Sequence, residues 1–359
     1  MMKLLSQLER QQLQGKSVFL RVDFNVAVEG GTITEPFRIE AAKPTIEYLL
    51  QSGAKVTLAS HIESIKTFGP IRNQITKILG HQLTLLENTR TNPGEKENSE
   101  AFAAELAAGH DVYVNDAFAV AHREHASVAA ITKLLPSYAG FLIEKETTEL
   151  AKSLDAPADG KVLVLGGAKI STKLPVIRNF LDKAQYVVVG GALVNNFYKF
   201  DGFEIGTSKY NADELKLLEG LDRTKLLIPE DVLVSKGFDG TSEVRVAKAS
   251  AVASDEAILD IGPESAKRFA EIIGGSEMAI WNGPMGLAEI PSFSRGTRVV
   301  AEAVAQSMRS IIGGGDTIGI ANKVAPQAKF SYVSTGGGAM LEFLSGKKLP
   351  ALEALGYYE

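Results

Sequence analysis

Short apolar runs alternate with longer amphipathic stretches along this chain of 359 residues. One apolar run in the first half is "SVFLRVDFNV" (17–26), and one in the second half is "KVLVLGG" (161–167). The stretch "IEAAKPTIEYLLQSG" (39–53) lies between two such runs, and its apolar residues recur at helical spacing. Strands that alternate with helices predict parallel sheets with helices on both faces, so the sequence indicates an α/β fold.

The apolar runs predict a series of strands in each half. Besides the two above, the predicted strands cover 55–60, 83–88, 111–118, 139–145, 184–191, 225–234, 277–283, 316–321 and 331–337. A second helix is predicted over 99–109, and the polar residues 235–256 predict either a β excursion or a surface insertion. Because single cores stop growing at about 250–300 residues, we expect two domains. Their boundary is predicted near 145–160, where a charged helical stretch runs into Pro, Asp and Gly.

Composition excludes several classes of site. The chain has no cysteine, which excludes disulfides, thiolate metal sites, iron–sulfur clusters and a cysteine nucleophile. Lys and Arg total 38 against 43 Asp and Glu, so no overall basicity indicates binding to nucleic acid or to an anionic membrane. The N-terminus lacks the apolar core of a secretory signal, and no apolar run approaches the ~20 residues of a membrane helix. We therefore expect a soluble, cytoplasmic protein.

Glycines follow the ends of predicted strands in the second half. They are the pairs Gly166–Gly167 and Gly190–Gly191 and the runs Gly313–Gly315 and Gly336–Gly338. Glycine lets backbone N–H groups approach a ligand, and a helix N-terminus behind such a loop attracts anions. A single glycine pair is more often only a tight turn. Their repetition favours a ligand site, because ligands of open α/β sheets bind beyond the carboxyl ends of the strands.

Two lysines and an aspartate accompany these glycines. Lys169 and Lys173 are four residues apart, so on a helix they share a face. Such a pair is usually a solvated basic face, but the dipole at a helix start disfavours cations, and a bound polyanion would offset that cost. Asp316 would be either an N-cap or a ligand of Mg²⁺, which binds phosphates with help from only one or two carboxylates. The second half thus indicates a nucleoside-triphosphate site without a Walker loop.

Basic residues recur near the ends of predicted strands in the first half. Arg38 precedes a helix, His61 closes a strand, and Arg90 and Arg123 follow two further strands. A single arginine is more often part of a surface ion pair, and acidic residues stand close in sequence to Arg90 and Arg123. His61 is explained equally well as a ligand contact or as a core histidine. Because Arg binds phosphate and carboxylate bidentately, the recurrence favours a small anionic substrate.

Eight stretches, in this order, resemble one family over essentially the whole chain, the phosphoglycerate kinases. The stretches are "RVDFNV", "RIEAAKPTIEYLL", "LLENTR", "VYVNDAFAVAHR", "GGAKISTKL", "IWNGPMG", "GGGDT" and "STGGGAMLEFLSGKKLP". The resemblance implies two Rossmann-like domains that face each other across a cleft and are joined by a hinge helix. It implies a 3-phosphoglycerate-binding domain over 1–148, a nucleotide-binding domain over 149–340, and a final segment, 341–359, that packs back on the first domain.

The resemblance also implies the site residues. The positions that match the family's triose-binding residues are Asp23, Phe24, Asn25, Arg38, His61, Ser64, Arg90 and Arg123. The nucleotide side is matched by Lys169, Lys173, Glu289, Gly313, Gly314, Gly315, Asp316, Thr317, Gly336 and Gly337. Among these, Arg38, Lys169 and Lys173 would be catalytic, and Asp316 would face Mg²⁺.

The implied reaction is the reversible glycolytic conversion of 1,3-bisphosphoglycerate and ADP into 3-phosphoglycerate and ATP. Its partners would be these small molecules, with no nucleic acid and no membrane, and the protein would be a hinge-bending monomer. The attacking oxygens are already ionised near neutral pH, so the reaction needs no general base. Catalysis would rest on positioning and on charge stabilisation.

The sequence departs from the family at a few places. Where the family usually reads Ser-His-Leu-Gly-Arg-Pro, this chain has "SHIESI", which places Glu63 at the glycine and Ser64 at the arginine. The stretch from there to "LTLLEN" is shorter than usual, Ala119 replaces a glycine, and Ala288 replaces a phenylalanine. These changes leave a catalytically weakened, nucleotide-binding relative as an alternative function. A nicotinamide dehydrogenase is a second alternative, although the chain has no G-x-G-x-x-G.

Overall fold

The computed structural model describes residues 1–359, and the chain divides into two compact units. The first unit comprises residues 1–150 and 347–359, and the second comprises residues 151–346. The division near residue 150 falls inside the helix α7 (Phe141–Asp155). Residues 341–346 lie in the second unit, because α13 (Gly337–Leu344) packs against α8 (Ile170–Phe180) there.

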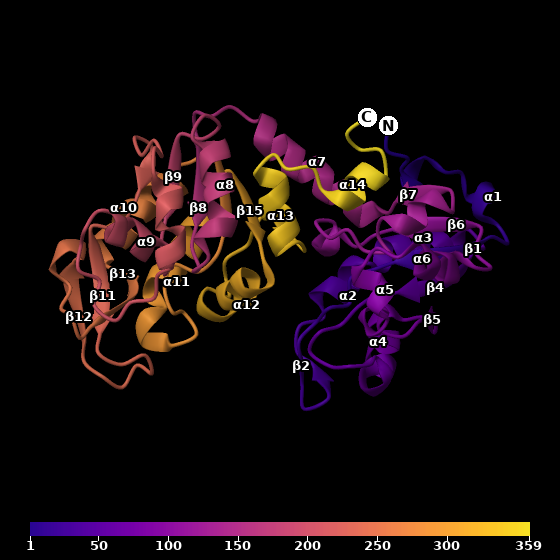
Figure 1. The fold of residues 1–359 in the computed structure, drawn as a ribbon, viewed down its shortest axis with the longest axis horizontal. Helices are drawn as coiled ribbons and strands as arrows, with labels where there is room; N and C mark the ends of the chain where they lie inside the picture. The colour runs from indigo at the N-terminus through magenta and orange to yellow at the C-terminus, as the bar shows by residue number, and fades with distance from the viewer. The chain divides into compact units, whose positions relative to one another are not determined.

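The first unit is built on a five-stranded sheet whose neighbouring strands are all parallel (Figure 1). Its order is β5-β4-β1-β6-β7, so the first strand of the chain lies at the centre. The strands are β1 (Ser17–Arg21), β4 (Lys55–Ala59), β5 (Thr84–Leu85), β6 (Val112–Asn115) and β7 (Ser137–Ala139), with a separate hairpin of β2 (Val28–Glu29) and β3 (Thr32–Ile33). The helices besides α7 are α1 (Arg10–Leu13), α2 (Phe37–Ala41), α3 (Lys43–Gln51), α4 (Arg72–Leu79), α5 (Pro93–Lys96), α6 (Glu100–Ala107) and α14 (Pro350–Ala354).

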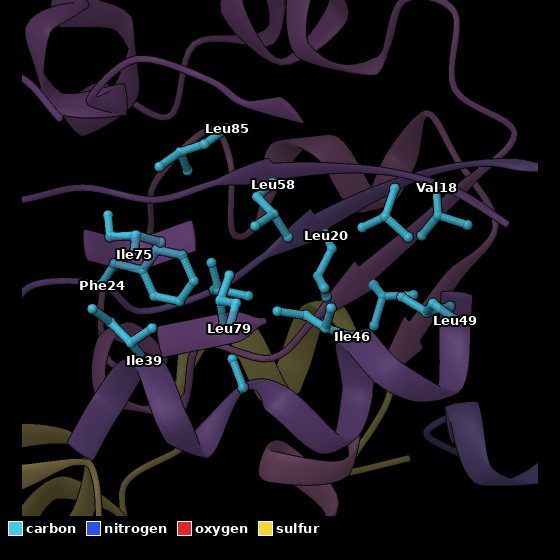
Figure 2. Close-up of a cluster of buried hydrophobic side chains, with 14 of the residues drawn as sticks. Val18, Leu20, Phe24, Ile39, Ile46, Leu49, Leu58, Ile75, Leu79 and Leu85 are labelled. Carbon is cyan, nitrogen blue, oxygen red and sulfur yellow. The ribbon is translucent and has the colours of Figure 1, made fainter. Parts of the chain in front are cut away.

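Alternate residues of β1 point to opposite faces of this sheet. Val18 and Leu20 pack into an apolar cluster with α2, α3 and α4, as Figure 2 shows. Phe19 packs into a second cluster, which includes residues of α6. Because both faces are covered, four of the five residues of β1 are fully buried, and this is why its sequence is almost continuously apolar.

The second unit is built on a six-stranded parallel sheet of order β10-β9-β8-β14-β15-β16. Its strands are β8 (Lys161–Leu165), β9 (Tyr186–Val189), β10 (Leu226–Leu227), β14 (Met278–Asn282), β15 (Arg309–Gly313) and β16 (Tyr332–Ser334). Its helices besides α8 and α13 are α9 (Leu193–Phe200), α10 (Pro263–Gly274), α11 (Arg295–Gln306) and α12 (Gly315–Val324). A smaller antiparallel sheet contains β11 (Asp231–Ser235), β12 (Val244–Lys248) and β13 (Ala257–Ile261).

Counted along the chain, the strands of the second sheet have the order 3-2-1-4-5-6, and those of the first have the order 3-2-1-4-5. Both are doubly wound, Rossmann-like sheets, which confirms the predicted α/β fold. In such sheets the connections run opposite ways on either side of a switch point, and a crevice opens there beyond the strand ends. The switch points are β1/β6 in the first unit and β8/β14 in the second.

Several predicted elements differ from the observed ones. The predicted strand 316–321 is wrong, because these residues form the first turns of α12, and the strand is β15, just before the glycines. The predicted strand 139–145 is also wrong, since β7 ends at Ala139 and α7 begins at Phe141. A short apolar run does not by itself distinguish a strand from a buried helix.

Proline and glycine mark the other differences. The helix predicted over 39–53 is two helices, α2 and α3, and Pro44 lies in the first turn of the second, where its missing N–H is tolerated. The strand predicted over 225–234 is two strands, because Pro229 separates β10 from β11. Residues 235–256 are a β excursion, which carries β12.

Candidate functional site

The first unit gathers polar and basic side chains beyond the carboxyl ends of its central strands. In the register of β1 and β4, Arg21 lies opposite Ala59. Asp23 and His61, each two residues further on, therefore meet, with the His61 Nδ1 atom 4.0 Å from the Asp23 Oδ1 atom. Both side chains are almost fully buried. The structure thus brings together two predicted site residues from different strands.

Arg38 lies against the same aspartate. Its Nη1 atom is 3.1 Å from the Asp23 Oδ2 atom and donates a hydrogen bond of 2.9 Å to the backbone carbonyl of Asn25. The Asn25 side-chain oxygen accepts a hydrogen bond of 2.9 Å from the backbone N–H of Glu63. Asp23 therefore orients Arg38, whose side chain stays about a quarter exposed, at 23%.

The histidines at this edge are neutral near pH 7. Burial lowers the pKa of His61 far below its ordinary value, and the positive charges of Arg21, Arg90 and Arg38 lower it further. Burial and the neighbouring Arg123 lower the pKa of His122 to about 4. Arg90 contributes to lowering the pKa of both histidines. The permanent positive charge at this edge comes from the arginines, which attract anions.

The arginines differ in their partners. Arg90, in the short 3-10 helix Thr89–Thr91, pairs with Glu63, which the sequence did not offer as a partner. Arg123 is exposed and forms no ion pair, despite the adjacent Glu124. Arg123 is thus free to meet a ligand, whereas Arg90 is already engaged.

The Phe24 side chain is buried, and the hydroxyl of the exposed Ser64 is bonded to the protein backbone. The Phe24 side chain is fully buried in the apolar cluster of Figure 2, since it continues the inward-facing residues of β1. Its backbone N–H donates to the Ser60 hydroxyl at 2.8 Å. The Ser64 hydroxyl donates to the backbone carbonyl of Val26 at 2.8 Å and so closes its own loop.

A buried ion pair lies at the carboxyl end of β1, next to the polar residues of the first unit. Arg21 and Glu95 have no exposed side-chain surface and lie 3.9 Å apart, and Ser127 bonds to both. His125 Nδ1 lies 3.8 Å from the same carboxylate. The site residues proposed from the sequence did not include this network. Its only signal in the sequence was Arg21, a charged residue within an apolar strand.

In the second unit, the glycine turns pack backbone against backbone. A Cβ atom on Gly191 would lie 2.6 Å from the Gly167 nitrogen and 2.7 Å from the Pro284 oxygen, and its φ of +63° also disfavours other residues. Gly314, with a φ of +100°, makes the turn between β15 and α12. A Cβ on Gly337 would lie 3.0 Å from the Gly314 Cα. The turns after β8 and β9 therefore pack against each other, and so do the turns after β15 and β16. Together, these turns at the carboxyl ends of the strands are called the glycine edge.

Lys173 and Lys169 occupy different environments at this edge. Lys173 is 6% exposed and donates hydrogen bonds to the side-chain carbonyl of Asn282 and, at 3.3 Å, to its backbone carbonyl. Burial lowers the Lys173 pKa to about 7, while the negative charge of Asp316 opposes that shift. Lys169 is exposed at the N-cap of α8. Only Lys173 is therefore held in place before any ligand binds.

The structure distinguishes the two roles that the sequence left open for Asp316, an N-cap or a magnesium ligand. The N-cap of α12 is Gly314, and Asp316 lies exposed in the first turn without a hydrogen-bond partner for its side chain. The next residue, Thr317, accepts a hydrogen bond of 2.8 Å from the Gly283 nitrogen and is buried. The Asp316 carboxylate is therefore not used as a cap. No group of three or more His, Cys, Asp or Glu residues in the chain is placed to hold a metal ion by itself.

Asn282 was missed by the sequence reasoning. It ends β14 at the switch point, accepts from Lys173, and donates a hydrogen bond of 2.7 Å to the carbonyl of Gly313. It thereby connects α8 to the glycine turn before α12. Its position directly after an apolar strand, in "IWNG", was the signal that could have identified it.

A pocket of about 220 Å³ opens beside these turns within the second unit. Most of its walls are glycine and apolar side chains, and Glu289 lies at its lining. The lining also includes Gly167, Ala168, Gly191, Ala192, Phe238, Pro284, Met285 and Leu287. Its apolar walls suit a flat, mostly apolar group such as a nucleobase.

Comparison with known proteins covers both units. A family model described as phosphoglycerate kinase matches residues 8–79 and 64–347. The chain is 40% identical to the phosphoglycerate kinase of Moorella thermoacetica over 381 aligned positions, which span 96% of this chain and 97% of that protein. The chain belongs to the phosphoglycerate kinase family. Identity to the phosphoglycerate kinase of Francisella tularensis subsp. novicida is also 40%, with 96% of each chain covered.

Solved phosphoglycerate kinase structures share the fold. The structure from Coxiella burnetii covers 99% of both chains with a TM-score of 0.86 and 35% identity. That from Pyrococcus horikoshii has a TM-score of 0.87 and 30% identity, covering 99% of this chain and 98% of that one. The two segments matched by the phosphoglycerate kinase family model overlap at residues 64–79. No helix in the chain is long and apolar enough to cross a membrane.

Proposed function

We propose that this family member binds its phosphoglycerate on the first unit and its nucleotide on the second. The reaction is reversible phosphoryl transfer between 1,3-bisphosphoglycerate and ADP, which gives 3-phosphoglycerate and ATP. The enzyme is a phosphotransferase with a carboxyl group as acceptor. The observation that carries the two-site assignment is the placement of both residue sets at the switch points of doubly wound sheets.

The triose would bind to the arginine cluster of the first unit. Arg38, which Asp23 orients, would face the carboxyl end where the phosphoryl group is transferred. Arg90 and Arg123 would bind the other anionic group, because guanidinium groups match phosphate bidentately. The neutral imidazole of His61 and the amide of Asn25 would add hydrogen bonds. Phe24 would contribute only through its backbone, since its side chain is in the core.

The nucleotide would bind along the glycine edge of the second unit. Its base would occupy the apolar pocket that Glu289 lines, and its phosphates would meet Lys173 and the N–H groups around Gly313–Gly315, Thr317 and Gly336–Gly337. Such N–H groups, with a helix dipole behind them, stabilise anions. Lys169, exposed and unpaired at the start of α8, would contact the transferring group.

The exposed Asp316 carboxylate fits a magnesium ion bound to the nucleotide phosphates, because Mg²⁺ in such sites takes only one or two protein carboxylates. When bound, the ion would neutralise phosphate charge. The protein's own part is to position the reactants and to balance charge with Arg38, Lys169 and Lys173. No general base is required, since the attacking oxygens are ionised at neutral pH.

A coupled assay tests this function. 3-Phosphoglycerate, ATP and Mg²⁺ are supplied, and the 1,3-bisphosphoglycerate formed is reduced at the expense of NADH. We expect turnover that depends on all three components. ATP binding without turnover would instead support a catalytically weakened relative, which no present observation favours. NADH fluorescence unchanged by the protein alone would argue against the dehydrogenase alternative.

We further propose that the enzyme is monomeric, because each predicted set of ligand contacts is complete within one chain. Light scattering of the full chain would test this. A cytoplasmic location is proposed from the reaction, since its substrates are metabolites of the cytoplasm; fractionation of cells would test it.

A further inference from the structure

Glu63 pairs with Arg90 through contacts that hold both residues in place. The Glu63 Oε1 atom accepts a hydrogen bond from the Arg90 Nη1 atom. The Arg90 side chain is 15% exposed and has no other ion-pair partner, and its Nε atom is buried without a hydrogen bond. The carboxylate of Glu63 is therefore the only anionic group that Arg90 contacts.

The backbone on both sides of this pair is fixed by two amide side chains, of which Asn88 is buried and Asn25 is half-buried. The Asn88 Oδ1 atom accepts from the Ile62 nitrogen at 3.3 Å and from the Arg90 nitrogen at 3.2 Å. The Asn88 Nδ2 atom donates to the Ile62 carbonyl at 2.8 Å. Glu63 itself donates its N–H to the Asn25 side chain. One buried asparagine thus sets the spacing between the Glu63 loop and Arg90.

The Glu63 carboxylate has the charge and shape of the ligand group that Arg90 is suited to bind. An arginine binds carboxylate and phosphate oxygens in the same way. The Glu63 side chain is 63% exposed, so it can turn into solvent without leaving a buried charge. Arg90, at 15% exposure, has much less freedom to move. An incoming anion would therefore displace the glutamate and not the arginine.

We propose that Glu63 is an intramolecular competitor for Arg90 and thereby sets the enzyme's affinity for its phosphorylated, anionic substrate. This inference rests on the proposed function, in which Arg90 contacts the triose. Substrate must first break the Glu63–Arg90 pair, so the apparent dissociation constant is the intrinsic one divided by the fraction of enzyme in which Arg90 is free. An ion pair whose carboxylate is exposed to solvent leaves that fraction at about one half to one sixth.

The test replaces Glu63 by its neutral isostere. Glu63→Gln should lower both the KM for 3-phosphoglycerate and its dissociation constant, measured by calorimetry without nucleotide, by about two- to sixfold. The KM for ATP should not change, and the melting temperature should stay within about 2 °C. Glu97→Gln is the matched control, because Glu97 is an exposed glutamate of the same unit without an ion pair, and it should leave the triose KM unchanged.

A double-mutant cycle with Arg90→Gln distinguishes the outcomes. If Glu63 acts through Arg90, Glu63→Gln should have no effect on triose binding in the Arg90→Gln background. An equal gain in both backgrounds would overturn the proposal, since Glu63 would then only repel anions in general. No gain in the parent, with Arg90→Gln still weakening triose binding, would overturn the proposal and leave the proposed function intact. If Arg90→Gln leaves triose binding unchanged, the placement of the triose on Arg90 fails as well.

Discussion

The ammonium group of Lys173 donates its hydrogen bond to the side-chain carbonyl of Asn282, so a buried lysine of α8 is held by a neutral partner at the end of β14. Its one nearby negative charge, that of Asp316, is on an exposed side chain. Burial without a closely paired anion explains why the Lys173 pKa falls to about 7. A bound polyphosphate would provide the missing charge.

ATP binding should therefore take up a proton. Because burial lowers the pKa of Lys173 to about 7, part of the free enzyme carries a neutral Lys173 near neutral pH, and bound phosphates favour the charged form, so the pKa rises on binding. Above pH 7 binding must also protonate the lysine, and the affinity should fall by at most about tenfold per pH unit. Calorimetry at pH 8 in buffers of different ionisation enthalpy measures the uptake.

Lys173→Met is the control for this proton uptake. It should abolish the uptake and weaken ATP binding, while 3-phosphoglycerate binding on the other unit stays near the parent value. Removing a charge-assisted contact costs about 1.5–3 kcal/mol. Equal losses for both ligands would indicate a folding defect, and uptake that persists in the variant would assign the proton to another group.

Asp316→Asn should raise the Mg²⁺ concentration needed for half-maximal turnover and lower kcat, with little change in thermal stability. The Asp316 side chain caps no helix and bonds to no protein group, so its loss should not destabilise α12. A magnesium titration of turnover, with a melting curve for each variant, checks both parts. Unchanged magnesium dependence would contradict the metal assignment.

Two neighbouring glycines offer a matched test of the glycine edge. Gly167 and Gly191 both have positive φ, of +80° and +63°, but only Gly191 lacks room for a Cβ atom. Gly167→Ala should lower the free energy of unfolding by about 1–2 kcal/mol, from backbone strain alone. Gly191→Ala should lower it by about 1–3 kcal/mol more, since its methyl group meets the backbone of Gly167 and Pro284.

Denaturant unfolding of the two variants measures this difference. Because Gly167 and Gly191 both line the apolar pocket, either substitution should weaken ATP binding as well. Equal destabilisation of the two variants would mean that the glycine turns are not packed against each other in solution.

The loop after β4 should respond to restoring the family's arginine. Ser64 provides no charge, and Glu63 occupies Arg90, so Glu63→Gly with Ser64→Arg should lower the 3-phosphoglycerate KM more than Glu63→Gln does. One added charged contact of about 1.5–3 kcal/mol corresponds to roughly ten- to a hundredfold. Lys66, two residues further along the same loop, has an exposed side chain. If its ammonium group contacts the triose, Lys66→Ala in the parent should raise the 3-phosphoglycerate KM. Steady-state kinetics at saturating ATP would measure both effects.

These kinetic results can also reject the loop's role. If the restored variant gains nothing and Lys66→Ala is silent, the loop does not touch the substrate. The ATP KM should be unaffected in all of these variants, since the substitutions lie in the first unit.

The sequence by itself determined the fold class and the family. Strands buried on both faces, such as β1 and β8, must be apolar along their length, and that pattern is readable without a structure. Glycines at the strand ends such as Gly166 and Gly191 were also identifiable from the sequence, because close backbone contacts leave no room for a Cβ atom there. The order of the eight motifs along the chain predicted the family, and the full-length comparisons confirmed it.

Only the tertiary structure decided which residues meet. It showed that residues 316–321 form a helix, which leaves Asp316 exposed, although their apolar run is equally compatible with a strand. It placed Lys169 in solvent and buried Lys173, although both lie at the start of one helix. It paired Arg90 with Glu63, 27 positions away in sequence, and not with the acidic residues closer along the chain. Side-chain partners and burial depend on which strands and loops fold next to each other, and spacing along a chain does not contain that information.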